Sequence, residues 1–416
     1  LILMLPICTA NKEGASFLDA LFTATSAACV TGLIVQDTAT YWSGIGQFVI
    51  ISLIQIGGLG IVTVAILIEI FSRKKIGLKE RSTMQDAISA HNVGGIVKLT
   101  GFILKTTLLF EIIGALLMAP AFCREFGFWK GIWYGGFHSI SAFCNAGFDL
   151  MGVKEQFSSL TYFADHPIIN LTIMGLIICG GLGFMTWEDV LKHRIHWRKY
   201  RMQSKVILVT TACLIMIPSL YFFLFEYAKL PLAGRILRSL FQSVTPRTAG
   251  FNTTDLALFS ETGIAIVILL MLIGGSPGST AGGMKTTTIA VLLATSLSVF
   301  RRKEDAHFFG RRIENETIRN AATIFLMYIT LCLLGGFAIS TMEKLPLLTC
   351  LYETASAIGT VGLTLGVTPQ LGAASQIILI LLMYAGRVGG LTLIFAAVSG
   401  KRESAVRFPK EKLTVG

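Results

Sequence analysis

The chain has 416 residues, of which 53% are hydrophobic and only 14% are charged, and its mean hydropathy is +0.69. Soluble domains carry about 25% charged residues, so this composition excludes a soluble globular protein and indicates one embedded in a lipid membrane. The net charge is +11. No surface of interleaved basic and aromatic residues accompanies it, so we expect no nucleic-acid partner.

Apolar segments follow one another along the chain. Each has close to the ~20 residues that a helix needs to cross a bilayer, either alone or together with the apolar segment that continues it. They cover residues 48–71, 96–122, 168–187, 206–225, 263–273 continued by 286–300, 323–339 and 376–399. We interpret residues 1–8 as the outer end of a further, truncated helix. The pattern predicts an all-α polytopic membrane protein with eight spanning helices. The eight Cys form no CxxC pair, so we expect free thiols, most of them buried.

Lys and Arg gather between these apolar segments. Four groups, at residues 73–98, 192–205, 301–319 and 401–412, hold 6, 6, 6 and 5 of them, or 23 of the 35 in the chain. The predicted spans put all four groups on one side of the membrane, and the positive-inside rule makes that side the cytoplasm. We therefore expect a multi-pass protein of a bacterial plasma membrane with both termini in the cytoplasm.

A short glycine motif recurs four times: CVTGL at 29–33, CNAGF at 144–148, RTAGF at 247–251 and IGTVGL at 358–363. Each follows a segment of about a dozen residues that is too short to cross a membrane, and each precedes an apolar, glycine-containing helix. The repeats divide the chain into units at 1–81, 82–203, 204–312 and 313–400, with a cytoplasmic tail at 401–416. Each unit is predicted to contain a helix, a pore helix, a filter loop and a second helix around a pseudo-fourfold pore.

Small residues before a glycine suit a backbone that presents its carbonyl oxygens to a dehydrated cation. The motifs contain no ring of acids or of bases, so we predict selection by carbonyls, with a negative field from the helix C-termini. One glycine per loop predicts a K⁺-preferring filter that discriminates loosely among monovalent cations. A single motif of this kind is usually a turn, whereas four at matching positions favour a filter. The predicted K⁺-binding residues are Val30, Thr31, Gly32, Asn145, Ala146, Gly147, Thr248, Ala249, Gly250, Thr360, Val361 and Gly362.

The third unit interrupts its second helix with GGSPGSTAGGMK at residues 274–285. At ~1 kcal/mol per Gly and ~3 per Pro, this segment predicts a loop below the filter rather than a kinked helix. Lys285 and Arg387 lie about 24 and 21 Å along a helix from the basic end, so each must find partners inside the protein. We interpret Arg387 as a constriction; a buried pairing, for instance with Glu111, is the alternative. The predicted gating residues are Gly274, Gly275, Ser276, Gly278, Ser279, Thr280, Gly282, Gly283, Lys285 and Arg387.

The four motifs, the insert GGSPGSTAGGMKTT at 274–287 and the segment GRVGGLT at 386–392 resemble the Ktr/Trk/HKT superfamily of potassium-uptake proteins. The ending FPKEKLTVG at 408–416 is more similar to its Ktr membrane subunits. The resemblance implies a subunit that conducts K⁺ with some Na⁺, a homodimer with one pore per protomer, and a cytosolic ring of RCK-type nucleotide-binding regulators. It also implies that the motif glycines form the filter, that residues 274–285 gate it and that Arg387 constricts it. Glycine in all four loops, where some members have serine in the first, favours K⁺ over Na⁺.

An alternating-access cation symporter is the main alternative, because such carriers also contain repeats and broken helices. The four units are parallel rather than inverted, which argues against a symporter. A membrane enzyme would need a cluster of nucleophile, base or metal ligands, and neither the six His nor the buried acids form one. We therefore expect no enzymatic activity and no organic cofactor on this chain.

Overall fold

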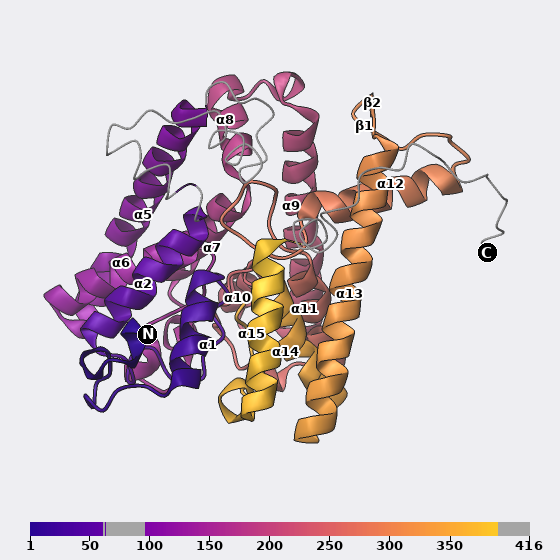
Figure 1. The fold of residues 1–416 in the computed structure, drawn as a ribbon. Helices are drawn as coiled ribbons and strands as arrows, with labels where there is room; N and C mark the ends of the chain where they lie inside the picture. The colour runs from indigo at the N-terminus through magenta and orange to yellow at the C-terminus, as the bar shows by residue number, and fades with distance from the viewer. Residues whose placement is uncertain (61–62, 64–95, 390–416) are drawn as a thin grey trace.

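The computed structural model describes residues 1–60, 63 and 96–389, and its regular structure there is almost entirely helical. Within these ranges three helices are long and apolar enough to cross a membrane: α5 (Ile96–Phe126), α9 (Met202–Tyr221) continued by the π-helical turn η6 (Phe222–Glu226), and α13 (Asn315–Glu343). In Figure 1, α5 lies at one side of the molecule and α13 at the other. Helices satisfy their backbone hydrogen bonds internally, as a bilayer requires.

Each long helix packs against the shorter helix that follows it in the chain. These short helices are α6 (Phe128–Phe143), α10 (Leu232–Val244) and α14 (Leu347–Gly359), and a fourth, α1 (Phe17–Ala28), follows the 3-10 turns η1 (Ile2–Met4) and η2 (Pro6–Cys8). With 12 to 16 residues, none of the four can cross a bilayer. All four are followed by a loop that contains one of the glycine motifs.

A second apolar helix follows each of these loops. The helices are α2 (Gly44–Leu59), α7 (Pro167–Gly181), α11 (Glu261–Leu272) and α15 (Ala373–Val388). Gly60 ends α2, Gly183 precedes α8 and Gly389 ends α15; their φ of 85–88° is a backbone conformation that glycine adopts without strain. At Gly183 the chain bends by 98° into α8 (Phe184–His193).

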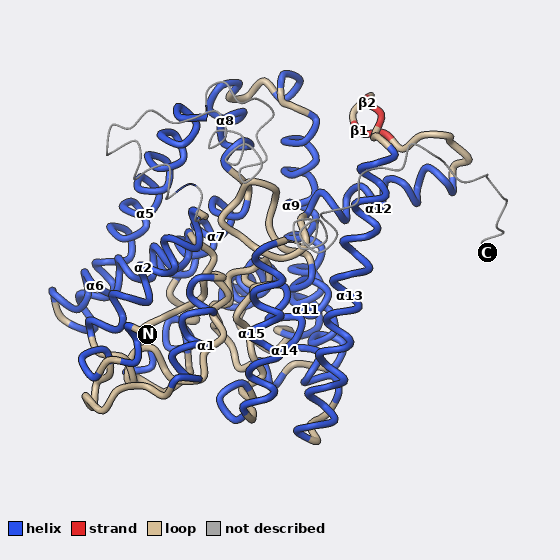
Figure 2. The backbone as a smooth tube through the Cα atoms, viewed as in Figure 1, coloured by secondary structure: helices blue, strands red, loops and turns tan. Residues whose placement is uncertain are grey.

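In the third unit the break is longer. Residues 274–285 form a loop between α11 and α12 (Thr286–Phe300). This confirms the predicted loop, and the alternative of a kinked continuous helix is wrong. The loop runs through the middle of the molecule, as Figure 2 shows.

The remaining short elements lie in the connections. The strands β1 (His307–Phe308) and β2 (Arg311–Arg312) pair antiparallel in a small hairpin, at the end of the molecule where α8 also lies (Figure 1). The 3-10 turns are η3 (Met151–Val153), η4 (Ser159–Phe163), η5 (Trp197–Lys199), η7 (Leu256–Leu258) and η8 (Thr368–Gln370). All but η5 connect a glycine loop to the second helix of the same unit.

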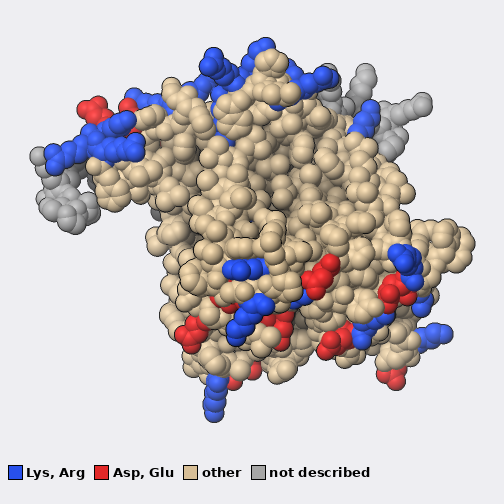
Figure 3. Space-filling view, turned by 180° about the vertical axis from the view of Figure 1, so that it is seen from behind, with Lys and Arg blue, Asp and Glu red and all other residues tan. Residues whose placement is uncertain are grey.

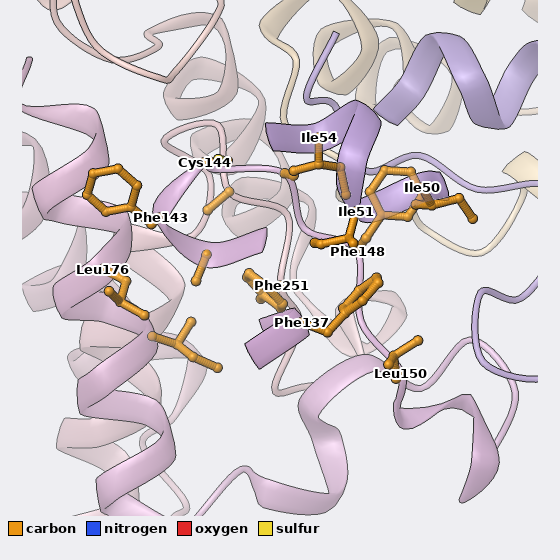
Figure 4. Close-up of a cluster of buried hydrophobic side chains, with 14 of the residues drawn as sticks. Ile50, Ile51, Ile54, Phe137, Phe143, Cys144, Phe148, Leu150, Leu176 and Phe251 are labelled. Atoms are coloured by element: carbon orange, nitrogen blue, oxygen red, sulfur yellow. The ribbon is translucent and has the colours of Figure 1, made fainter. Parts of the chain in front are cut away.

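Buried apolar side chains pack behind the glycine loops. Figure 4 shows part of the larger cluster, in which Phe148 and Phe251 lie beside Phe137 of α6 and Ile51 of α2. A second cluster joins α11, α13, α14 and α15. By contrast, the outer faces of the long helices carry exposed apolar residues such as Leu116, at 67% exposure. Exposed apolar surface of this extent is unfavourable in water and suits contact with lipid.

Charged residues gather at the two ends of the molecule. Figure 3 shows a tan band nearly free of Lys, Arg, Asp and Glu between a mainly basic end and an end that mixes both signs. Two of the predicted basic groups, at 192–205 and 301–319, lie around α8, η5 and the hairpin. The other two fall outside the described residues apart from Lys98. The eight Cys are free thiols, and Cys213 alone of them is exposed.

Among the described residues, three helices qualify as membrane spans, or four if the bent α7–α8 pair counts as one. The residues that follow Gly60 and Gly389 lie outside the described residues, so the expected count of eight spans stays a prediction. One prediction of the fold needs correction. Residues 1–8 form the two 3-10 turns η1 and η2 rather than the end of an α-helix, and Pro6 begins the second turn.

We predict that Asp189 of α8 stabilises the basic end of the molecule. Its buried carboxylate accepts hydrogen bonds from the Arg201 backbone N–H (3.0 Å) and the Ser204 hydroxyl (2.6 Å). Asp189→Ala should lower the free energy of unfolding by about 1.5–3 kcal/mol, because the buried Ser204 hydroxyl and the Arg201 N–H lose a charged acceptor. The neighbouring Glu188 pairs with Arg201 at an exposed position, so Glu188→Ala should cost less than about 1 kcal/mol. Equal losses of melting temperature in detergent would contradict this account.

Candidate functional site

The four glycine motifs adopt one backbone conformation. We call them glycine loops 1 to 4, at residues 29–33, 144–148, 247–251 and 358–363. In each loop the motif glycine has a positive φ, between 68° and 94°. The residue two positions earlier also has a positive φ, of 52–65°, although it is not glycine; these residues are Val30, Asn145, Thr248 and Thr360. Such a conformation costs a β-branched residue of order 1–3 kcal/mol, so the surrounding structure must impose it.

The four loops close into a ring in chain order. A Cβ atom added to any motif glycine would lie less than 3.0 Å from the carbonyl oxygen of the next loop, too close for any side chain. The contacts run from Gly32 to Ala146, from Gly147 to Ala249, from Gly250 to Val361, and from Gly362 to Thr31. The structure therefore brings all twelve predicted filter residues together, three from each loop.

Side chains of the short helices hold the loops from behind. Ser26 and Ser356 accept hydrogen bonds from the N–H groups of Gly32 and Gly362, both at 3.0 Å. In loops 2 and 3, the Ser141 and Thr245 hydroxyls donate instead to the carbonyl of the residue after the glycine. The residue after each glycine is apolar and 0–1% exposed; these residues are Leu33, Phe148, Phe251 and Leu363. These contacts hold the backbone of each loop in place.

The polar groups at the contacts of this ring are backbone carbonyl dipoles. The carbonyl oxygens at the four contacts each lie beside a neighbouring glycine, and backbone carbonyls can replace the hydration shell of a monovalent cation. None of the four loops contains a carboxylate. One base, Arg247 of loop 3, is buried, and its guanidinium donates to the Thr211 hydroxyl at 3.4 Å.

The 274–285 loop lies against the ring and against the α7–α8 bend. The Ser276 N–H donates to the Gly181 carbonyl (2.9 Å), and the Gly278 carbonyl accepts from the Phe184 N–H (2.9 Å). Within the loop, the Ser279 hydroxyl donates to Ser276. The loop is closed by hydrogen bonds from the Gly274 N–H to Met284 and from the Thr286 N–H to Gly275.

Two more of its glycines contact glycine loop 4. A Cβ on Gly282 or on Gly283 would overlap Thr360 and the Gly359 carbonyl, respectively. The loop is therefore seated directly on the ring. Lys285, at its end, donates to the Ala281 carbonyl at 2.8 Å.

Arg387 of α15 connects three backbone segments. Its guanidinium donates to the Thr280 carbonyl of the 274–285 loop (2.5 Å), to Gly57 at the end of α2, and to Gly58 (3.4 Å). Among the described residues it makes no ion pair, so the alternative pairing with Glu111 is wrong. Arg387 is partly buried, and a guanidinium deep in an apolar helix needs such charge-assisted hydrogen bonds; here they hold the loop in place.

Two residues of this site were missed in the sequence. Glu353 of α14 is fully buried and accepts hydrogen bonds from the Thr364 and Thr368 hydroxyls (2.7 and 2.5 Å) and from the Leu365 N–H (3.0 Å). His138 of α6 accepts from the Leu150 N–H (3.3 Å). Both precede their motif glycine by nine positions and bond the N–H three positions after it. The shared offset was a signal in the sequence, but the two side chains differ in type.

Comparisons with known proteins agree with this architecture. Residues 3–405 match the TrkH family, which is described as cation transport protein. This chain belongs to the TrkH family of cation transport proteins. Since members are transport proteins and not enzymes, the sequence resemblance and the expected lack of enzymatic activity are confirmed.

Individual relatives match over nearly all of this chain. The chain is 39% identical to the potassium/sodium uptake protein NtpJ of Enterococcus hirae and 39% identical to the Ktr system potassium uptake protein B of Bacillus subtilis. Each match covers 100% of this chain and 93% of the relative. The fold is similar to the crystal structure of the potassium transporter TrkH from Vibrio parahaemolyticus, with a TM-score of 0.73 at 20% identity over 92% of this chain and 78% of that one.

The ring predicts that substitutions of two glycines between α14 and α15 differ in their effect on stability. Gly362 and Gly366 have φ of 94° and 88°, but a Cβ would overlap the Thr31 carbonyl at Gly362 and would meet nothing within 4 Å at Gly366. Both substitutions to Ala add backbone strain of about 1–3 kcal/mol. Gly362→Ala should lower the melting temperature distinctly more, because it also separates loops 4 and 1. Similar melting temperatures for the two variants would show that loops 4 and 1 do not approach this closely.

Proposed function

We propose that this chain is the ion-conducting subunit of a potassium uptake system, passing K⁺ with some Na⁺ through a filter made by the four glycine loops. The observation that carries the proposal is the closed ring of backbone carbonyls. Membership of a cation transport family and the uptake of potassium named for the two 39% identical relatives support it. Selection by carbonyl dipoles suits a monovalent cation that gives up its water shell.

The proposed architecture is one pore within one chain. The units at 1–81, 82–203, 204–312 and 313–400 each contribute a pore helix, a filter loop and a second helix, with 401–416 as a tail. The four pore helices all end at the ring, so the partial negative charges of their C-termini favour a cation there. We assign the basic end around α8 and the hairpin to the cytoplasm, by the positive-inside rule.

The 274–285 loop is the proposed gate. It is seated against glycine loop 4 and is bonded to the Arg387 guanidinium, which adds a positive charge next to the path of a cation. Hydrogen bonds and charge therefore both oppose conduction in this conformation. Opening requires the loop to give up its bond to Arg387.

The proposed assembly is a homodimer in the plasma membrane that binds a cytosolic ring of RCK-type nucleotide-binding subunits. The Bacillus subtilis relative is named as part of a Ktr system, which supports a complex of several components. The exposed basic hairpin β1–β2 and its neighbour η5 offer a surface at the proposed cytoplasmic end. A regulator docked there could act on the gate through α12, which begins directly after the loop.

The first functional prediction concerns selectivity. Liposomes containing the purified chain should take up ⁸⁶Rb⁺, with external K⁺ competing at lower concentration than Na⁺. Gly362→Ser should reduce this preference, because the side chain displaces a carbonyl of the ring, whereas Gly366→Ser should retain it. Absence of uptake by both the wild-type chain and an Arg387→Ala variant, or equal preference in the two glycine variants, would refute the proposed filter.

The second prediction concerns the gate. Arg387→Ala should increase ⁸⁶Rb⁺ flux roughly tenfold, because the closed loop loses a charge-assisted hydrogen bond and the pore loses a positive charge. Arg124→Ala, which removes an exposed arginine in the last turn of α5, serves as the control and should leave flux unchanged. A correctly folded Arg387→Ala protein with wild-type flux would exclude a gating role.

A further inference from the structure

Thr280 lies where the gating loop contacts glycine loop 2. Its fully buried hydroxyl shares its one proton between two acceptors, the Phe143 carbonyl at the end of α6 (3.0 Å) and Oδ1 of Asn145 (3.3 Å). Its own carbonyl accepts from Arg387 (2.5 Å), and its N–H donates to the Gly180 carbonyl (3.2 Å). One residue of the gating loop thus joins the constricting arginine to a residue of the proposed filter.

Asn145 extends this connection to the next glycine loop. Its buried Nδ2 lies 3.3 Å from the Arg247 carbonyl and 3.5 Å from the Thr248 hydroxyl, both in loop 3, and 3.4 Å from the Ile177 carbonyl. Carbonyl oxygens only accept hydrogen bonds, whereas the Thr280 hydroxyl can donate one, so these partners fix which end of the amide faces the gate. The amide therefore spans from the gating loop to the seam between glycine loops 2 and 3.

The gate also contacts the opposite side of the ring. Gly282 lies against Thr360 of glycine loop 4, and the order of contacts around the ring places loop 4 across from loop 2. The gating loop therefore contacts opposed quarters of the filter. The two contacts differ in chemistry, since the one with loop 4 is close packing and the one with loop 2 is a hydrogen bond between side chains.

We propose that the Thr280–Asn145 hydrogen bond couples the filter to the gate, with Thr280 as a positioning residue that holds the loop closed through a filter side chain. The inference rests on the proposed conduction function and deepens it. Coupling free energies between two sites are reciprocal. A change at Asn145, within the filter, must therefore shift the opening equilibrium of the loop, as a change at Thr280 does.

The sign of the effect separates this coupling from a purely structural role. Damage to a filter residue reduces flux, whereas loss of a bond that stabilises the closed loop increases it. Thr280→Val and Asn145→Ala should each increase ⁸⁶Rb⁺ flux into liposomes about threefold to tenfold, the equivalent of one buried hydrogen bond. Thr280→Ser keeps the hydroxyl and should restore wild-type flux. Thr295→Val, in α12, removes a hydroxyl that bonds only its own helix and should have no effect.

A double-substitution cycle tests the pair itself. Under the proposal, Thr280→Val increases flux less in an Asn145→Ala background, where only the bond to the Phe143 carbonyl remains to be lost, than in the wild type or in an Asn145→Asp background, where an acceptor oxygen remains. An equal increase in all three backgrounds would overturn the coupling. If Thr280→Val fails to fold, Asn145→Ala alone decides, because a decreased or unchanged flux contradicts the proposal.

Failure of the proposed function gives a different result. If neither the wild-type chain nor Arg387→Ala conducts, conduction itself is wrong, and the cycle is then measured in melting temperature. Non-additive losses in Thr280→Val and Asn145→Ala would support the bond, and additive losses would overturn it. If both reference proteins conduct and Thr280→Val matches the wild type, the coupling alone is wrong.

Discussion

The close approach of four backbone loops around one ring is the constraint on which the rest of the structure depends. Each loop can pack a carbonyl against its neighbour only where the neighbour has no Cβ, which accounts for one glycine per loop. The same requirement extends outward to the second helices. Gly57, Gly180 and Gly386 allow these helices to approach the carbonyls at the ends of α1, α6 and α14, with no space for a side chain. Glycines in the loops and glycines in the surrounding helices together position the ring.

Departures from fourfold repetition are where the proposed control elements lie. Within the described residues, the third unit has a loop of twelve residues after its second helix, and the fourth unit supplies Arg387 near the end of the corresponding helix. The buried residue nine positions before the motif glycine also differs between the units. It is Thr23 in the first, His138 in the second, Phe241 in the third and Glu353 in the fourth. A pore built within one chain can vary each quarter separately, which a tetramer of identical subunits cannot do.

The ring and the loop were predictable from the sequence because both depend on glycine, which marks positive φ and close approach in the sequence itself. Arg387 was found because a cation deep in an apolar helix must have internal partners, but the sequence could not tell the carbonyls of Gly57 and Thr280 from an acid such as Glu111. Glu353 and His138 were missed, since bonds across a folded loop leave no shared residue type. Residues 1–8 were expected to end a helix because their apolar composition does not distinguish an α-helix from the two 3-10 turns that they form.

The central claim is that monovalent cations bind within the ring of the four glycine loops. Anomalous X-ray diffraction from crystals grown in RbCl tests it most directly. Rubidium peaks should lie on the axis of the ring, within coordination distance of carbonyl oxygens from all four loops, and should weaken when Na⁺ replaces Rb⁺. An ordered ring without a rubidium peak, together with a peak elsewhere in the protein, would contradict the assignment of these loops as the filter.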